Sequence, residues 1–261
     1  MKTMKYFIPY IFYSACILFL GSCNKSETSN VTNSVGGGKG GVVGKGGSMA
    51  RFTIGNNTLY TVDNNTIKAY DITNPANPSS ETALTLEGNP MLETIFYYDN
   101  KLFIGSRNAM YTYDVSNPIS PVHLSTYNHV LSCDPVVVQG NTAYVTLRSG
   151  NNCGRTQSFL DVIDISNPSN PILVKSITMV SPYGLGVQGN TLFVCEGNNG
   201  FKVYDVSNAQ DPVLVKTITG MFGYDVIPLT NLLLLTGTNG LFQYTYTNPN
   251  DIQWISTIPV Q

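Results

Sequence analysis

Carboxylates are the side chains in this chain whose spacing could support chemistry. Four of them occupy one position in related segments, each just before a Ser-Asn or Thr-Asn turn: Asp71, Asp114, Asp164 and Asp205. Metal binding or acid-base catalysis needs such groups to converge on one point. A residue that recurs once per repeat is instead spread around the structure, and the turn that follows has NH groups that need acceptors. We therefore interpret these four acids as structural.

The segments around these acids form an internal repeat. The clearest copy is Phe201-Lys202-Val203-Tyr204-Asp205-Val206-Ser207-Asn208, and a fifth copy at residues 244–249 lacks the acid. The copies lie about 40 residues apart, a period typical of solenoids, propellers and arrays. Charged residues make up only 11% of the chain and long Glu/Lys/Ala/Leu stretches are missing, which favours an all-β fold.

Each repeat is predicted to hold four short strands. In the fourth copy they cover residues 184–188, 191–196, 201–206 and 213–219. Gly189-Asn190 between the first two strands is a hairpin signal, and Gly140-Asn141 repeats it in the third copy. A Ser-Asn-Pro-x-x-Pro turn separates the third and fourth strands, as at residues 116–121. Each copy therefore predicts a four-stranded antiparallel meander.

The third strand of each repeat has two largely apolar faces. One position of this strand holds Ile67, Met110, Leu160, Phe201 and Leu241. Another holds Tyr70, Tyr113, Ile163, Tyr204 and Tyr244. A free-standing sheet cannot bury both faces, whereas sheets stacked around an axis can. We therefore predict a five-bladed β-propeller of four-stranded antiparallel blades over residues 49–261.

The repeats resemble the LVIVD repeat of bacterial and archaeal surface proteins, in which a hydrophobic strand ends in Val-Asp-[Val/Ile]-Ser-[Asp/Asn]-Pro. Val162-Ile163-Asp164-Ile165-Ser166-Asn167-Pro168 carries this pattern well. The fifth copy departs from it, because Thr245 stands at the position of the acid. The resemblance implies a surface-associated propeller and implies no particular activity.

The N-terminus has the features of an export signal. Met1-Lys2-Thr3-Met4-Lys5 is basic, and residues 6–20 are uncharged and largely apolar, too short for a membrane span of about 20 residues. Leu20-Gly21-Ser22-Cys23 follows and resembles the lipobox of bacterial lipoproteins, which implies cleavage after residue 22 and lipidation of Cys23. The alternative is an ordinary signal peptide with a chance Cys. Asn24, by the same resemblance, implies the outer membrane, on its periplasmic or its outer side.

Residues 23–48 are predicted to be a flexible tether between this signal (residues 1–22) and the propeller, since they are Ser/Asn-rich and then Gly-rich. Gly44-Lys45 is followed by Gly46 rather than Ser or Thr, so this is not a phosphate-binding loop. The first 50 residues hold five of the 14 basic groups and one of the 16 acids, which leaves 9 basic and 15 acidic groups, or −6, for the rest. A domain of that charge without a basic cluster is not expected to bind nucleic acid.

A candidate site lies where the innermost strands begin. If the first strand of each blade is innermost, one face, here called the top face, carries the links between blades and the loops between second and third strands. Aligned inner strands place two successive columns of residues at the centre of that face, here called the mouth. The outer column holds Glu93, Asp134, Tyr183 and Tyr224. The next holds Arg51, Thr94, Pro135, Gly184 and Asp225.

These residues support three kinds of site. Aromatic and Arg side chains are common anchors of binding surfaces, and we expect Tyr183, Tyr224, Arg107 and Arg148 to contact a ligand together with the three acids. Paired carboxylates could instead hydrolyse a glycosidic bond. Glu93, Asp134 and Asp225 could also hold a cation. A merely solvated rim is the remaining alternative, and we assign no catalytic or metal-binding residue.

The longest top-face loop, residues 148–157, contains Cys153. Cys133 precedes the first strand of the same blade, so both thiols are expected at the top face. In an oxidising envelope a Cys133–Cys153 disulfide would close a loop of about 20 residues and stabilise the fold by roughly 3 kcal/mol. Two free thiols are the alternative. Cys195 is expected to be a buried small apolar residue.

The expected protein is a non-enzymatic binding module without a cofactor. It would be held at the membrane of a bacterial envelope by its lipid and would present the top face to an envelope protein or a glycan. A carbohydrate-active hydrolase and a structural scaffold of an envelope complex are the two alternatives.

Overall fold

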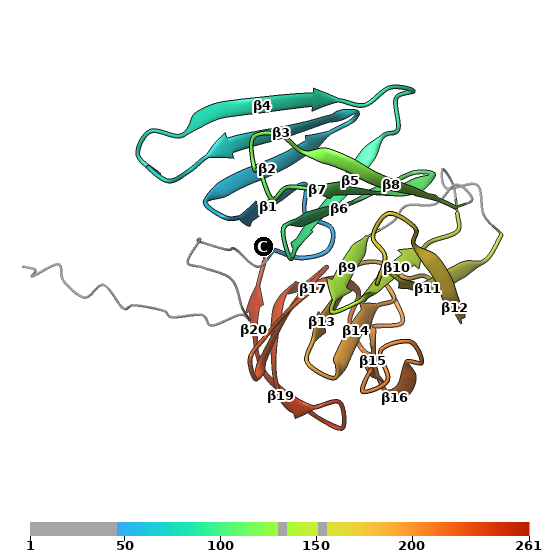
Figure 1. Ribbon diagram of the computed structural model, residues 1–261. Helices are drawn as coiled ribbons and strands as arrows, with labels where there is room; N and C mark the ends of the chain where they lie inside the picture. The colour runs from blue at the N-terminus through green and yellow to red at the C-terminus, as the bar shows by residue number, and fades with distance from the viewer. Residues whose placement is uncertain (1–45, 130–134, 151–155, 261) are drawn as a thin grey trace, which may run out of the picture. The chain divides into compact units, whose positions relative to one another are not determined.

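The computed structural model describes residues 46–129, 135–150 and 156–260. Within these ranges the chain forms twenty β-strands in five four-stranded sheets (Figure 1). The same ranges contain no helix long and apolar enough to cross a membrane. The prediction of an all-β, five-bladed propeller is confirmed.

Each sheet is one blade, built from four strands that are consecutive in the chain. Blade 1 holds β1 (Phe52–Gly55), β2 (Thr58–Asp63), β3 (Thr66–Asp71) and β4 (Ser79–Thr85). Blade 2 holds β5 (Leu92–Tyr98), β6 (Lys101–Ser106), β7 (Ala109–Asp114) and β8 (Val122–Asn128). Blade 3 holds β9 (Val136–Gln139), β10 (Thr142–Leu147), β11 (Ser158–Asp164) and β12 (Ile172–Met179). Blade 4 holds β13 (Leu185–Gln188), β14 (Thr191–Cys195), β15 (Phe201–Asp205) and β16 (Val213–Ile218). Blade 5 holds β17 (Gly223–Leu229), β18 (Leu232–Gly237), β19 (Gly240–Asn248) and β20 (Asp251–Pro259).

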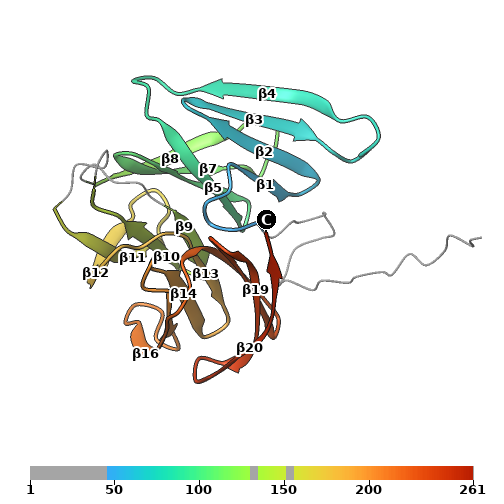
Figure 2. The ribbon, with the colours of Figure 1, turned by 180° about the vertical axis from the view of Figure 1, so that it is seen from behind.

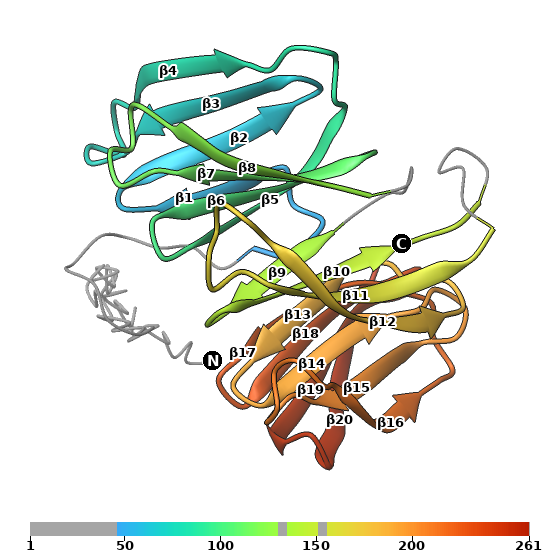
Figure 3. The same cartoon turned by 45° about the vertical axis from the view of Figure 1, so that its right-hand side comes forward.

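The first strand of each blade is the innermost one. Contacts between neighbouring blades join β1 to β5, β5 to β9, β9 to β13 and β13 to β17. The fourth strands β4, β12 and β16 lie on the outside of the propeller (Figure 2), and β9, β13 and β17 lie nearer its centre (Figure 3). This order confirms the assignment of the top face, because it puts the links between blades and the β2–β3-type loops at the same end.

All neighbouring strands within a blade are antiparallel, so each blade is the predicted meander. The strands of the fourth copy agree with the prediction to within one residue at each end. Where Asn-Asn replaces Gly-Asn, Asn56 and Asn57 both take positive φ, 49° and 58°, as a tight hairpin turn requires. In every blade the register between the third and fourth strands shifts just before the Tyr70 position or its equivalent. Blade 5 has a second shift, between Tyr246 and Asn248.

The repeated acids have the structural role expected of them. The carboxylate of Asp114 accepts the backbone NH of Ser116 at 2.7 Å, and Asp164 does the same for Ser166 at 2.8 Å. Equivalent bonds occur at Asp71 and Asp205. Hydrogen bonds from the Ser or Thr two residues later hold the pKa of all four carboxyls below the ordinary value of 3.8. Each acid therefore organises the turn at the end of its own strand.

Four apolar clusters join successive blades. In each cluster, the face of a third strand that carries Ile67 or its equivalent packs against the next blade. The face of that next blade is the one that carries the equivalent of Tyr70. Ile67 and Phe201 are 1% and 0% exposed, and Tyr113 and Tyr244 on the opposing faces are 5% and 3% exposed. Both faces of a central blade are thus buried, as the two apolar positions predicted.

The contact between blades 5 and 1 differs from the other four. Leu241 and Tyr70, which would complete the same pattern there, are only half-buried, and no cluster of buried apolar residues joins the two blades in the part of the chain that the structure describes. No strand exchange closes the ring either, because β1 pairs with β2 and β20 pairs with β19. Residues 46–50, here called the clasp, connect the blades on this side.

Candidate binding site at the mouth of the propeller

The clasp crosses the mouth and is held by hydrogen bonds to three blades. Ser48, 1% exposed, donates its hydroxyl to Oδ1 of Asp225 in blade 5 at 3.0 Å and accepts the NH of Leu185 in blade 4 at 2.8 Å. The Ala50 carbonyl accepts the NH of Ile95 in blade 2 at 3.0 Å. The chain then continues into β1 of blade 1. A single short segment therefore ties four blades together at the mouth.

Asp225 is the acid at the centre of this arrangement. The backbone NH of Met49 donates to Oδ2 at 3.2 Å, beside the bond from Ser48 to Oδ1. Burial raises the pKa of the carboxyl from 3.8 to about 6, although the donors of Met49, Ser48 and Val226 act in the opposite direction. A Cβ added to Gly184 would come within 2.0 Å of this carboxylate, so only glycine fits beside it.

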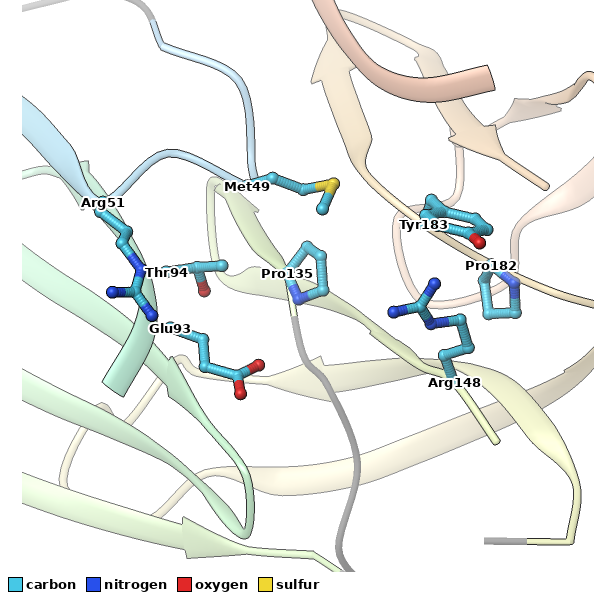
Figure 4. A pocket seen from close by; sticks show the side chains of 8 residues that line it. All are labelled: Met49, Arg51, Glu93, Thr94, Pro135, Arg148, Pro182 and Tyr183. Atoms are coloured by element: carbon cyan, nitrogen blue, oxygen red, sulfur yellow. The ribbon is translucent and has the colours of Figure 1, made fainter. Parts of the chain in front are cut away.

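A cavity of about 250 Å³ lies next to the clasp at the mouth. It is lined by Met49, Arg51, Glu93, Thr94, Pro135, Arg148, Pro182 and Tyr183. Arg51, Glu93 and Thr94 lie on one side of Met49, and Arg148, Pro182 and Tyr183 lie on the other (Figure 4). The cavity thus draws on four blades and combines two guanidinium groups with apolar walls.

Tyr183 and Arg148 form one wall of the cavity as a unit. The guanidinium carbon of Arg148 lies 4.2 Å from the centroid of the Tyr183 ring, a cation–π contact. The backbone of Tyr183 is fixed on both sides, since its NH donates to the Cys195 carbonyl at 2.8 Å and its carbonyl accepts the Thr146 hydroxyl at 2.7 Å. The Tyr183 ring is therefore presented by rigid backbone.

Tyr183 belongs to an aromatic cluster that extends onto blade 5. Its ring centroid lies 5.3 Å from that of Phe222 and 6.0 Å from that of Tyr224, and the last two are 4.5 Å apart. Tyr224 is 39% exposed, so part of the cluster faces solvent. The structure brings together the two tyrosines of the outer column and adds Phe222.

Glu93 lies between the cavity and a second hollow on blade 2. Its Oε1 is 3.6 Å from Nε of Arg107. Arg107 also lines a more open hollow of about 420 Å³ with residues of the link between blades 1 and 2. The one described acid of the cavity wall is therefore already next to an arginine.

Sequence inspection did not single out Glu196, which holds the start of the link that carries Tyr183. Glu196 is 1% exposed, and its carboxylate accepts the NH of Val180 at 2.8 Å and lies 2.9 Å from Nζ of Lys202. Val180 opens the link that carries Pro182 and Tyr183. In the sequence, Glu196 is marked only as an acid that directly follows an apolar strand. Its ion-pair partner, Lys202, lies six residues later, across a hairpin.

The predicted site residues have different outcomes. Glu93, Arg148 and Tyr183 line one cavity, Arg107 and Tyr224 flank it, and Asp225 lies under the clasp. Asp134 and the two thiols of the predicted Cys133–Cys153 disulfide lie outside the described residues, as does Cys23. Among the residues that the structure describes, no group of three His, Cys, Asp or Glu side chains could hold a metal ion. Cys195 is a buried free thiol, as expected.

Comparison with known families identifies the repeat. A family model described as the LVIVD repeat matches residues 132–179 and 183–219. These ranges contain the strands of blades 3 and 4. The chain is a β-propeller whose blades 3 and 4 carry LVIVD repeats. Both matched copies carry the Asp-[Val/Ile]-Ser-Asn turn, which blade 2 also has at residues 114–117. No curated protein sequence matches the chain.

Solved structures share the fold of this LVIVD propeller at low sequence identity. The periplasmic gluconolactonase PpgL of Pseudomonas aeruginosa has a TM-score of 0.62 at 10% identity, with 78% of the chain and 68% of PpgL covered. A chain of the mitotic checkpoint complex gives 0.59 at 15% identity, with 79% and 64% covered. The computationally designed Ika8 protein gives 0.56 at 13% identity, with 77% and 59% covered. The chain thus spans less than two thirds of the last two, and all three show the fold alone.

Proposed function

We propose that this LVIVD propeller is a membrane-tethered binding module of a bacterial envelope that holds a protein or glycan partner at its mouth. The observation that carries this proposal is the cavity of about 250 Å³ walled by Arg51, Arg148 and Tyr183. Concave sites with apolar walls and a few convergent polar groups are the usual form of ligand sites. Arg and Tyr are also the residues most often found at the energetic centre of binding surfaces.

The state of the two described carboxylates favours binding over hydrolysis. Glu93 lies beside Arg107, and Asp225 accepts hydrogen bonds from Ser48 and Met49 under the clasp. A glycosidase needs two carboxyl groups that face the same bond, one as acid and one as nucleophile or base. The engaged positions of Glu93 and Asp225 support a role in shaping the mouth.

The N-terminal sequence supports the proposed location at a membrane of the bacterial envelope. Leu20-Gly21-Ser22-Cys23 would supply a lipid anchor, and the predicted tether, residues 23–48, would lead from it to the propeller, with its last three residues in the clasp. The chain enters the propeller through the clasp, at the mouth. A partner bound there would lie close to the point where the tether joins the domain.

The test is a pull-down from bacterial envelope extract with the full-length chain as bait. Tyr183→Ala combined with Arg148→Gln removes one wall of the cavity, and we expect recovery of the partner to fall about tenfold or more. Lys175→Gln, on the exposed outer strand β12, is the matched control for a lost positive charge and should leave recovery unchanged. Equal recovery with both variants would contradict a site at the mouth and favour the scaffold role.

A further inference from the structure

Blade 1 has an apolar face that no other blade covers. On the side turned away from blade 2 it carries Phe52, Leu59 and Tyr70, one on each of its first three strands. None of the three is buried: Phe52 is 56% exposed, and Leu59 and Tyr70 are half-buried. In the other four blades every equivalent residue is buried. In blade 4 these equivalents are Leu185, Leu192 and Tyr204.

Blade 5 has a matching free face on the side turned away from blade 4. Ile227 and Leu234 are paired across β17 and β18, and both are half-buried. Leu241 on β19 is also half-buried, and its partner on β20, Ile258, is 53% exposed. The equivalents of Leu234 and Leu241 in the other four blades are buried, as are Phe193 and Phe201 in blade 4.

These two faces are the two halves of the contact that joins every other pair of successive blades. At each of those junctions the equivalents of Leu234 and Leu59 belong to the same apolar cluster. The pairs are Tyr60 with Leu102, Phe103 with Ala143, Tyr144 with Leu192, and Phe193 with Leu233. Within one chain the two free faces do not cover each other, since β17 and β1 lack the contact that joins the other inner strands.

We infer that a second copy of this chain covers the two faces, with blade 5 of each copy packed on blade 1 of the other. A second copy carries both halves of the contact, and a two-fold axis gives each free face its matching partner. No apolar face is then left over, whereas large exposed apolar patches on a single copy are unusual. This interaction goes beyond the proposed function and is independent of what the mouth binds.

The two-fold arrangement is compatible with the proposed membrane anchor. Rotation about an axis parallel to the propeller axis keeps the top faces of both copies on the same side. The clasp lies at the mouth, where Ser48 bonds to Asp225 and Leu185, so both tethers would leave from that side. Lipids on Cys23 of both copies could therefore insert in one membrane. Confinement to that membrane would raise the concentration of each copy around the other.

The composition of the tether favours a second copy over the tether itself as the cover of these faces. Residues 23–45, ahead of the clasp, contain four large aliphatic residues, all valines, among Ser, Asn, Thr, Lys and Gly. These are Val31, Val35, Val42 and Val43. A segment of this composition buries little apolar surface and is favoured in water.

Cross-linking in the bacterial envelope tests the contact directly. Two differently tagged full-length copies are expressed in the same cells, one with Leu234→Cys and the other with Leu59→Cys, and a short bis-maleimide is added. We expect a product of twice the monomer mass that carries both tags. Ile172→Cys paired with Leu59→Cys is the matched control, because Ile172 is exposed on the outer strand β12, away from both faces. This pair should give no more product than the wild-type thiols.

Aspartate variants test whether the contact is reciprocal. Leu59→Asp or Leu234→Asp in both copies should lower co-purification of the two tags about tenfold or more, because each contact would then bury a charge against apolar side chains. One copy with Leu59→Asp and one with Leu234→Asp should co-purify better than either variant with itself, since one of the two contacts keeps both leucines. Ile172→Asp should leave co-purification unchanged.

The outcomes decide which molecule covers the faces. Absence of the two-tag product, or no recovery in the mixed aspartate pair, would overturn the inference. A cross-link confined to one chain that carries both cysteines would show that blades 5 and 1 close on each other instead. Exposure of the two cysteines to maleimide only after Val-to-Ser changes in residues 23–45 would assign the faces to the tether. If the aspartate variants unfold, the milder cysteine variants still decide. The pull-down with mouth variants tests the proposed function separately.

Discussion

Aspartates of this propeller show how one functional group takes opposite properties in two environments. Asp205 sits in an exposed turn, where the hydroxyl and NH of Ser207 lower the pKa of its carboxyl. Asp225 lies under the clasp, where loss of water raises the pKa of its carboxyl to about 6. The first acid stabilises a turn that every good repeat contains, and the second exists once, at the mouth.

The raised pKa of Asp225 predicts a pH dependence of stability. Because the folded-state value of about 6 lies above 3.8, the folded protein binds more protons than the unfolded chain between these values. The Asp225 contribution to the free energy of unfolding is therefore complete below pH 3.8 and is lost as pH rises through 6. A shift of two pKa units corresponds to about 3 kcal/mol. Urea unfolding of the wild type at several pH values from 4.5 to 7.5 measures this slope.

Asp225→Asn is the control for this pH dependence. It removes the titrating group, so the decline between pH 4.5 and 7.5 should be smaller in the variant than in the wild type. The repeated aspartates have lowered pKa values, so their contribution is lost only as pH falls below 3.8, outside this window. An identical decline in Asp225→Asn would show that another group is responsible.

Cys23 carries the prediction about the membrane anchor. We expect fatty-acid label to be incorporated into the wild-type chain in bacterial cells, and Cys23→Ser to abolish this incorporation, because the lipid is attached through the thiol of the lipobox cysteine. Cys195→Ser is a matched control, since that thiol is buried in blade 4. Label retained in Cys23→Ser would rule out the lipobox assignment.

At the level of elements, the β14–β15 hairpin connects the core of blade 4 to the mouth. Glu196 directly follows β14, pairs with Lys202 on β15, and accepts the NH of Val180 in the link from blade 3. A buried ion pair adds little net stability, but it fixes geometry because each charge needs the other. The hairpin thereby positions the link that carries Tyr183.

Removal of one partner of this pair should be costly. Glu196→Gln leaves the Lys202 ammonium, whose side chain is 17% exposed, without its counter-charge, and we expect a loss of about 3 kcal/mol in the free energy of unfolding. The double variant Glu196→Gln with Lys202→Met should regain most of it, because no unpaired charge remains. Chemical denaturation of both measures the difference. A double variant as unstable as the single one would contradict this account.

For the molecule as a whole, the decisive feature is that the five interblade contacts are unequal. Four are closed by apolar clusters, and the fifth, between blades 5 and 1, is bridged by hydrogen bonds of the clasp. A contact held by hydrogen bonds is less stabilising than one that buries apolar side chains, but hydrogen bonds fix the relative orientation of the groups that they join. The mouth and its cavity are thus shaped by the segment that also closes the ring.

Ser48→Ala tests the clasp. The change leaves the buried NH of Leu185 without its acceptor and Asp225 without one donor, so we expect a loss of about 1–3 kcal/mol and faster hydrogen exchange at Leu185 and Ile95. Ser207→Ala removes a comparable hydroxyl–carboxylate bond in an exposed turn and should cost less than about 0.5 kcal/mol. Unchanged exchange in Ser48→Ala would mean that the clasp does not hold the blades.

Much of this fold follows from local patterns. The period of about 40 residues, the two apolar positions of the third strand and the Asp-x-Ser-Asn turns are all short-range signals, and they predicted blade number, strand order and the role of Asp71, Asp114, Asp164 and Asp205. These patterns are reliable because every blade buries its two faces with the same kinds of residue at the same positions. The inner-strand columns also identified Tyr183, Tyr224 and Glu93 as residues of the mouth.

The sequence by itself determined the five sheets, their inner strands and the end of the propeller that carries the irregular loops, because alternation and turn chemistry act over a few residues. Only the tertiary structure decided how the ring is closed and what the mouth contains. Ser48 and Asp225 are 177 residues apart, and Thr146 and Tyr183 are 37 apart, so no local pattern marks either pair. These contacts form only when the folded blades pack against one another, so they depend on tertiary structure.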